Sequence, residues 1–245
     1  MPDIFVGTAG WNIPKAEASA FPPEGSHLAR YAQVLPAVEI NTSFYRPHRP
    51  ATYARWVATV PPGFRFAVKL PREITHDHRL ENAEAPLARF LSEVAALGPS
   101  LGPLLIQLPP SLRFDPSVAT PFLANLRART QADLVCEPRH PSWFTADAEA
   151  LLRETQVARV VADPTVVPMA AEPGGWPGLT YWRLHGSPEM YYSAYGPDRL
   201  ATLAERLRAT PTPAWCIFDN TAQGAATADA LALLHLLGTP AQPLR

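Results

Sequence analysis

Lysine is almost absent from this chain of 245 residues. Arginine outnumbers it nineteen to two, and the two lysines are Lys15 and Lys69. A lysine kept against that bias indicates a place where a guanidinium would not serve, because of its shape or because a buried ammonium group can lose its proton. Chance is the simpler alternative.

Cysteine is scarce too, and long apolar runs are missing. Cys136 and Cys216 both fall in strand-like apolar stretches, which favours small buried side chains in a reducing compartment over a disulfide or a zinc site. The chain begins directly with a strand-like stretch, without a basic region or an apolar run of signal-peptide length. We therefore predict a cytoplasmic protein with no membrane partner.

The chain also lacks the common phosphate and cofactor motifs. Its formal net charge of -1 gives no general attraction to polyphosphate, so nucleic-acid binding would need a local basic patch. The stretch Gly7-Thr8-Ala9-Gly10 has neither the lysine nor the spacing of a phosphate loop. Dinucleotide fingerprints, nucleophile elbows and zinc cysteine sets are absent as well, so the sequence leaves the cofactor unknown.

What the sequence does contain is a regular alternation of strand-like and helix-like segments, which is typical of a parallel sheet. The strand-like runs are Ile4 to Thr8, Val38 to Thr42, Arg65 to Leu70, Leu104 to Leu108, Leu134 to Arg139, Ala158 to Asp163, Thr180 to His185 and Trp215 to Asn220. The helix-like runs are Leu28 to Leu35, Ala51 to Thr59, Ala85 to Leu97, Ser117 to Arg129, Ala146 to Thr155, Arg199 to Ala209 and Ala222 to Leu237. The stretch Pro164 to Gly178 is rich in proline and glycine and predicts a loop.

These segments predict an α/β fold, a (β/α)8 TIM barrel that forms a single domain over residues 1–245. Hydrophobic residues make up 47% of the chain and charged residues 18%, which is enough apolar material for one large core. An open doubly wound sheet is the main alternative.

Most of the strand-like runs end in an ionisable or amide side chain. In chain order these are Glu39, Asn41, Lys69, Gln107, Glu137, Arg139, Asp163, Arg183, His185, Asp219 and Asn220. Sites of this fold lie at the carboxyl ends of the strands, so we expect one pocket there. Because buried charge is costly unless paired, the charged members are expected to form a network. A purely structural network that plugs the barrel is the alternative.

The roles that suit these side chains follow from their chemistry. Glu39 or Glu137 is the candidate general base, and His185, followed by a glycine, is the candidate acid. Lys69 could pair with Glu39, hold an anion or, if desolvated, form a Schiff base. Together with Arg139 and Arg183, it is expected to hold the negative charge of a substrate.

Aromatic residues in the strand-end loops could line a pocket for a ring or a sugar, or could only pack on the barrel rim. They are Trp11, Phe44, Tyr45, Trp143, Tyr191, Tyr192 and Tyr195, of which Trp11, Tyr45 and Trp143 are taken as substrate-binding. His76-Asp77-His78 has the spacing of a metal-binding pair but lies in a loop, so we predict no metal site.

Several stretches carry a resemblance to a known family. They are Gly7 to Trp11, Val38 to Tyr45, Phe64 to Lys69, Gly102 to Pro110, Glu137 to Trp143, Arg183 to Gly186 and Phe218 to Thr221. In these the chain resembles the YecE-like family, a bacterial group described as a domain of unknown function with a TIM-barrel fold. The resemblance implies the fold and supplies no established reaction.

The chain departs from the pattern of that family at a few positions. The family usually has serine where Ala9 stands, an aromatic or aliphatic residue where Pro138 stands, and asparagine where Asp219 stands. Further aromatics usually follow Trp11, where this chain has Asn12-Ile13.

The sequence thus predicts a barrel enzyme that acts by general acid and base chemistry on a small anionic or phosphorylated substrate, sugar-like ones included. The reaction would be that of a hydrolase, a lyase or an isomerase. Two alternatives stay open: a nuclease-like or nucleic-acid-binding barrel, which is less favoured, and a ligand-binding module without catalysis.

Overall fold

The computed structural model describes residues 2–238 and places a sheet of mostly parallel strands at the centre of the molecule. The strands are β1 (Ile4–Ala9), β2 (Ala37–Ile40), β3 (Arg65–Lys69), β4 (Leu101–Gln107), β5 (Leu134–Glu137), β6 (Val157–Arg159), β7 (Val161–Asp163), β8 (Gly174–Gly175), β9 (Thr180–Leu184) and β10 (Ala214–Phe218). Their order in the sheet is β7-β9-β10-β1-β2-β3-β4-β5-β6-β8.

The sixth strand of the expected barrel is divided in two, and this division closes the ring. Strands β6 and β7 are separated only by Val160, so the two are halves of one extended segment. The first half pairs with β5 and the second half pairs with β9, both in parallel. The pairing excludes an open doubly wound sheet and confirms the predicted TIM-like barrel.

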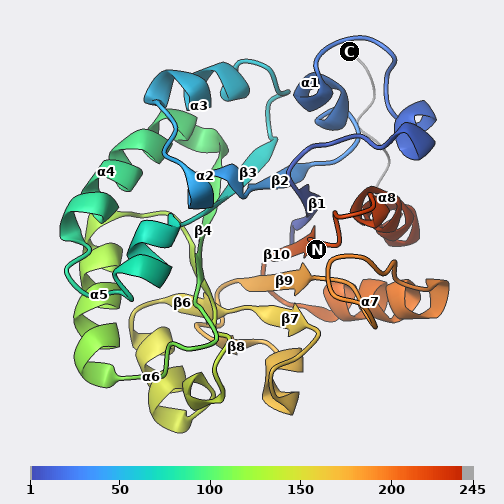
Figure 1. Ribbon diagram of the computed structural model, residues 1–245. Coiled ribbons are helices and arrows are strands. Elements are labelled where there is room, and N and C mark those ends of the chain that lie inside the picture. The colour runs from blue at the N-terminus through green and yellow to red at the C-terminus, as the bar shows by residue number, and fades with distance from the viewer. Residues whose placement is uncertain (1, 239–245) are drawn as a thin grey trace.

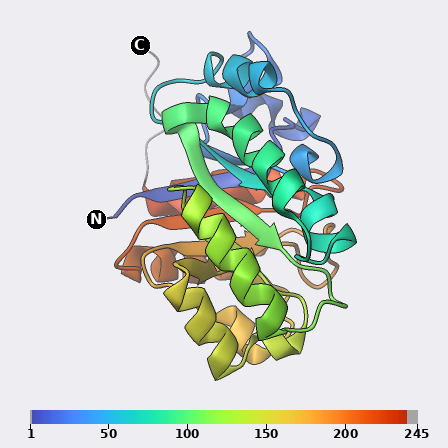
Figure 2. The ribbon, with the colours of Figure 1, turned by 90° about the vertical axis from the view of Figure 1, so that its left-hand side faces the viewer.

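The helices surround these strands. They are α1 (His27–Tyr31), α2 (Thr42–Tyr45), α3 (Pro50–Val57), α4 (Glu84–Val94), α5 (Pro116–Arg129), α6 (Ala146–Glu154), α7 (Pro197–Ala209) and α8 (Ala225–Leu237). In Figure 1 the helices α3 to α6 follow one side of the strands, and α7 and α8 lie on the other side. Figure 2 shows β4 running between α4 and α5.

Short helical turns complete the connections, and the described residues between β7 and β9 include no α-helix. The turns are η1 (Lys15–Ala20), η2 (Glu73–Asp77), η3 (Ala95–Ser100), η4 (Pro141–Trp143) and η5 (Pro168–Ala171). The stretch from Pro164 to Gly178 holds only η5 and the two-residue β8, which agrees with the loop predicted there. No helix of the described residues is long and apolar enough to cross a membrane.

Local sequence signals explain where several helices begin and end. Helix α5 starts after Asp115, whose carboxylate accepts a hydrogen bond from the Ser117 N–H, as an N-cap does. The first helix was expected to reach Leu35 but ends at Tyr31, where the chain passes into turns in which the Gln33 and Val34 N–H groups donate to carbonyls three residues back. Helix α8 starts at Ala225 rather than at Ala222, since Gly224 before it has a positive φ of 85°.

Two separate apolar cores follow from the alternation of side chains along the strands. The outer core fills the space between strands and helices. The inner core lies inside the ring and comprises Ala37, Ala67, Leu105, Val135, Ala158, Val160, Leu179, Tyr181, Trp215 and Ile217. The inward positions one step further along the strands are polar, and they form the site described next.

Candidate functional site

Arg183 is the centre of a buried ion cluster at the carboxyl ends of the strands. Its side chain is fully buried and reaches three carboxylates on three other segments. Its Nη2 lies 2.7 Å from Oε1 of Glu39 and 3.0 Å from Oδ2 of Asp219, and its Nη1 lies 2.7 Å from Oε2 of Glu137. One guanidinium therefore holds β2, β5 and the end of β10 together from β9.

The carboxylates of Glu137 and Asp219 are held in their charged form. Burial alone would raise the pKa of Glu137, but the guanidiniums of Arg139 and Arg183 outweigh it and hold that pKa well below its ordinary value. The pKa of Asp219 is likewise lowered, because Arg183 and a hydrogen bond from His185 outweigh the effect of burial. The Tyr181 hydroxyl adds a 2.8 Å hydrogen bond to Glu39.

His185 is fully buried beneath the mouth of the barrel, and both of its ring nitrogens are engaged. Nδ1 lies 3.0 Å from Oδ2 of Asp219. Nε2 lies 2.8 Å from Oε1 of Glu137 and 2.8 Å from Nη2 of Arg139. Tyr191 packs edge-on over the imidazole and donates its backbone N–H to the His185 carbonyl. His185 thus joins carboxylates and does not face the open space.

Above this cluster lies a hollow of about 580 Å³ that opens at the end of the barrel. Its lining comes from the segments after β2, β3, β9 and β10 and from the ends of β1, β3 and β4. The lining residues are Ala9, Asn41, Phe44, Tyr45, Lys69, Arg72, His76, Gln107, Tyr191, Asp219, Thr221 and Ala222. Glu39, Glu137, Arg183 and His185 form the layer below and are not among them.

Lys69 differs from the other cations of the site because it has no ion-pair partner among residues 2–238. Its side chain is 8% exposed, and its Nζ lies 4.0 Å from the ring centre of Phe44. Burial, and then the positive charge of Arg183, lower the pKa of this ammonium to about 8, against a smaller opposing effect from the carboxylates of the cluster.

His76 packs against the same Phe44 ring. Its imidazole packs edge-on to Phe44 at 4.9 Å, and its Nδ1 lies 2.8 Å from Oγ1 of Thr75. Burial, with Lys69 and Arg72 nearby, lowers the pKa of His76 below its ordinary value. The hollow therefore holds two titratable nitrogen groups whose charged forms are disfavoured.

Asp219 presents one oxygen to the cluster and the other toward the hollow. Oδ2 accepts hydrogen bonds from Arg183 and His185, whereas Oδ1 has only a contact of 3.5 Å with Nδ2 of Asn41. Gln107 accepts a bond from Arg183 at 3.3 Å through Oε1. Asp219, Asn41 and Gln107 therefore line the hollow as polar groups fixed from below.

Comparison with known proteins identifies the family. The family model described as "Protein of unknown function DUF72" matches residues 5–245. The chain belongs to this family. It is 29% identical over 168 residues to UPF0759 protein YecE of Escherichia coli strain K12, a match that covers 65% of this chain and 59% of that protein. It is 28% identical over 156 residues to UPF0759 protein YunF of Bacillus subtilis, covering 58% of this chain and 52% of that protein.

The chain thus matches between half and three fifths of the length of these curated relatives. Solved DUF72 structures share its fold over nearly the whole chain. One from Enterococcus faecalis V583 has a TM-score of 0.81, with 23% identity and 99% of both chains covered. One from Thermotoga maritima has a TM-score of 0.78, with 24% identity and 96% of this chain and 99% of that chain covered. At such identities the likeness concerns the fold alone.

Most of the residues that the sequence predicted for the site of this DUF72 protein do come together. The buried layer and the hollow bring together Glu39, Asn41, Tyr45, Lys69, Gln107, Glu137, Arg139, Arg183, His185 and Asp219. The grouping contains all four candidate catalytic residues, but only Lys69 among them reaches the hollow. The other three are buried beneath it.

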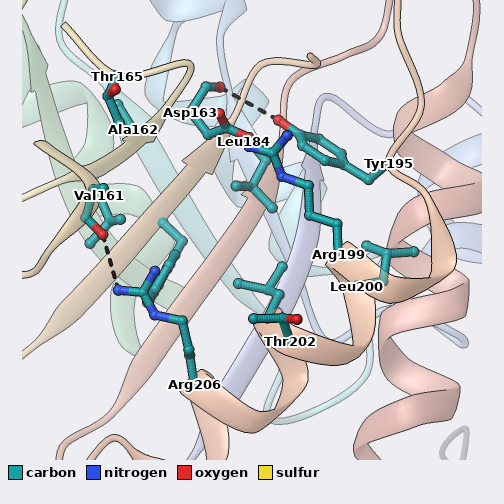
Figure 3. Close-up of a pocket in the computed structure, with 13 residues that line it drawn as sticks. Val161, Ala162, Asp163, Thr165, Leu184, Tyr195, Arg199, Leu200, Thr202 and Arg206 are labelled. Carbon is teal, nitrogen blue, oxygen red and sulfur yellow. Dashed lines mark hydrogen bonds and ion pairs between the residues drawn. The ribbon is translucent and has the colours of Figure 1, made fainter. Parts of the chain in front are cut away.

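Asp163 does not join the site, contrary to the expectation. Its side chain points away from the barrel interior and pairs with Arg199 of α7, while the Tyr195 hydroxyl contacts its backbone carbonyl, as Figure 3 shows. These groups line a separate apolar cavity of about 180 Å³ between β7, β9 and α7. The reason is alternation: Val160 faces inward, so Val161 and Asp163 face outward.

Three more predicted residues lie elsewhere in this DUF72 protein. Asn220 is buried on the outer side of β10 and donates to Ser193 and to Asp229. The Trp143 ring is buried in the outer core, and its indole N–H donates to the Leu112 carbonyl at 3.0 Å. Trp11 packs edge-on against Trp56 of α3 and does not line the hollow.

Sequence reasoning left Arg72 and His76 out of the site, although both line the hollow. They follow Lys69 closely, because η2 turns the chain back over the barrel mouth after β3. Tyr191 was grouped only with the loop aromatics, yet it closes over His185 in a conformation with a φ of +71°, which is uncommon outside glycine and often marks functional sites. Among residues 2–238, no three His, Cys, Asp or Glu side chains are grouped as metal ligands.

Proposed function

We propose that this DUF72 protein is an enzyme that binds a small anionic substrate in the hollow at the barrel mouth and transfers protons with Lys69. The observation that carries the proposal is the state of this amine. It is nearly buried, lines the hollow, and forms no ion pair with any of the described residues. A pKa of about 8 makes Lys69 a group that can give and take a proton near neutral pH.

The charge distribution around the hollow supports an anionic substrate. The carboxylates beneath the hollow are paired with Arg183 and Arg139, whereas Lys69 has no anionic partner among the described side chains. An unpaired ammonium in a partly desolvated site is stabilised by a bound anion. Arg72, at the rim, adds a second positive charge, though Asp77 pairs with it.

Polar groups at fixed positions support recognition of a small hydroxylated molecule. Asn41 and Gln107 line the hollow with side-chain amides, and Oδ1 of Asn41 has no hydrogen-bond partner in the described part of the chain. Aromatic faces from Phe44, Tyr45 and Tyr191 supply apolar walls. Such a lining suits a sugar phosphate or a small hydroxy or oxo acid.

The buried cluster has a supporting role in this proposal. Glu39, Glu137 and His185 are fully buried and paired, so they act through the position and charge of Asp219 and Lys69 rather than by touching the substrate. This revises the expectation that a glutamate is the base and His185 the acid. His76, which shares the Phe44 ring with Lys69, is the second proton carrier within the hollow.

Proton exchange offers a test that does not require the reaction to be identified first. The protein is incubated in D2O with a panel of sugar phosphates and 2-oxo acids, and loss of carbon-bound proton signals is followed by NMR. We expect exchange into at least one compound, a loss of about 100-fold or more in the exchange rate for Lys69→Met, and an unchanged rate for Lys15→Met, since Lys15 is exposed in η1.

Calorimetric titration of the same panel separates binding from proton transfer. Binding of a panel anion that weakens in Lys69→Met but not in Lys15→Met supports the site. If no compound of the panel binds or exchanges, or if Lys69→Met behaves as the wild type, the proposal is wrong. Salt-sensitive binding of DNA or RNA with no effect of the panel anions would favour a nucleic-acid-binding barrel instead.

A further inference from the structure

Among the described residues, Lys69 supplies the one primary amine that lines the hollow. The surroundings of this amine differ from those of an anion-binding lysine on a protein surface. Lys69 is held at the end of β3 with its stem inside the barrel, and its Nζ lies over the face of Phe44. The ion pairs of the site use arginine as the cation, through Arg139 and Arg183. The position whose amine lines the hollow, residue 69, is a lysine, although the chain has only two lysines.

We propose that Lys69 is a nucleophile that forms a covalent imine with the carbonyl carbon of an aldehyde or 2-oxo substrate bound in the hollow. The inference rests on the proposed function and adds the substrate class to it. Three observations carry it: an amine without an ion-pair partner among residues 2–238, its place in a hollow lined by amides and aromatic rings, and its desolvation.

The neutral amine is the reactive form, and the site enriches it. With a pKa of about 8 rather than the ordinary 10.5, the neutral fraction at pH 7 rises about 300-fold. A guanidinium at this position could not supply a neutral nucleophile, because it stays protonated in proteins. This difference gives a chemical reason for lysine at residue 69.

The step is balanced without an oxidant or a reductant. The neutral Nζ adds its lone pair to the carbonyl carbon, and the carbonyl π electrons move to the oxygen, which takes up one proton. The resulting carbinolamine loses a proton from nitrogen. Its hydroxyl takes up a second proton and leaves as water, while the nitrogen lone pair forms the C=N bond of a protonated imine. His76, beside the same Phe44 ring, is placed to move these protons.

The imine can be trapped by borohydride, which delivers a hydride to its carbon and leaves a stable secondary amine. Glycolaldehyde is a suitable probe because it is small enough to need no specific recognition; pyruvate and glyceraldehyde 3-phosphate test recognition. The adduct mass is that of the carbonyl compound less one oxygen atom. Peptide mapping by mass spectrometry then reports Lys69 and Lys15 separately within the same sample.

We expect glycolaldehyde at pH 7 to modify Lys69 at least 10-fold faster than Lys15, with a midpoint near pH 8 for Lys69. Lys69→Arg, which keeps the positive charge, should abolish the adduct at this position, and Lys15→Arg should leave it unchanged. Modification of Lys69 no faster than that of Lys15 with any of the three probes would overturn the proposal.

The outcome is distinguishable from failure of the proposed function. Proton exchange in D2O that depends on Lys69, without a trapped adduct, would leave the acid and base function standing and remove the imine. Rapid trapping at Lys69 without exchange into any panel compound would leave the imine standing and remove the acid and base function. Circular dichroism of Lys69→Arg confirms that loss of the adduct reflects the missing amine rather than loss of the fold.

Discussion

Replacing Arg183 with methionine tests whether the buried cluster is a structural requirement of the barrel mouth. Methionine keeps most of the volume and removes the charge. Arg183 makes contacts of 2.7 to 3.2 Å to Glu39, Glu137 and Asp219, all inside the protein. Breaking a buried ion pair by removing one partner costs about 3–5 kcal/mol, because the remaining charge is left uncompensated.

The three carboxylates would not suffer equally. Glu137 would keep Arg139 at 2.7 Å and His185 at 2.8 Å. Glu39 would keep only the hydroxyl of Tyr181 at 2.8 Å. The cost should therefore fall mainly on Glu39, and we expect the free energy of unfolding to drop by about 4 kcal/mol at pH 7. Urea denaturation followed by tryptophan fluorescence measures this difference.

The pH dependence gives the prediction a second signature. In the wild type, the lowered pKa values of Glu137 and Asp219 contribute stability that is present above their unfolded pKa values of about 4 and is lost as the pH falls through the folded values. In Arg183→Met, burial without the guanidinium raises the carboxylate pKa values, so the folded variant binds more protons between pH 4 and 7. The stability difference should therefore be largest at pH 7 and should shrink toward pH 4.

A surface pair supplies the control. Arg72 and Asp77 are 3.0 Å apart and about half exposed, so Arg72→Met should change the stability by less than about 1 kcal/mol. A difference below about 1 kcal/mol for Arg183→Met as well, or one that does not depend on pH, would show that the cluster does not hold the barrel mouth together and that the reasoning is wrong.

Three further substitutions test other parts of the structure. Tyr181→Phe removes a buried hydrogen bond to the Glu39 carboxylate and should lower the free energy of unfolding by about 1.5–3 kcal/mol in urea titrations. Gly102→Ala should lower the melting temperature, because a Cβ there would lie 2.6 Å from the Trp215 ring and overpacking costs about 1–3 kcal/mol. Asp163→Asn lies outside the hollow and should leave panel binding and proton exchange at the wild-type rate, whereas an effect on binding would place Asp163 in the site after all.

The fold could be predicted because its signals are local and repeated. Alternating strand-like and helix-like runs specify each strand–helix unit, and the proline and glycine residues between the runs predict the boundaries to within a few residues. The division of the sixth strand into β6 and β7 gave no such signal. Its two halves pair with different neighbours, and that arrangement follows from closing the ring rather than from residues 157–163 themselves.

The membership of the site could be predicted better than the roles of its members. Side chains alternate between the two faces of a strand, and this alternation alone separates inward from outward residues. Asp163 shares its face with Val161 and Asn220 shares its face with Phe218, and both Val161 and Phe218 point outward. Asp163 and Asn220 could have been left out of the pocket from the sequence. Alternation predicts the face of the strand but not how deeply a side chain is buried. Nothing in the sequence indicated whether Glu39 and His185 would line the hollow or lie buried beneath it.

The net charge of the buried cluster links it to Lys69. Glu39, Glu137 and Asp219 bring three negative charges, and Arg139 and Arg183 bring two positive ones, so one further proton-borne charge is needed for neutrality. Lys69, which feels all three carboxylates without pairing with any of them, is one place where that charge can reside. The imidazole of His185 lies between two of these carboxylates, those of Glu137 and Asp219. The net negative charge of the cluster opposes loss of the proton from the Lys69 amine, whereas burial and Arg183 favour it, so the opposing effects leave Lys69 with a pKa of about 8 and able to exchange a proton near neutral pH.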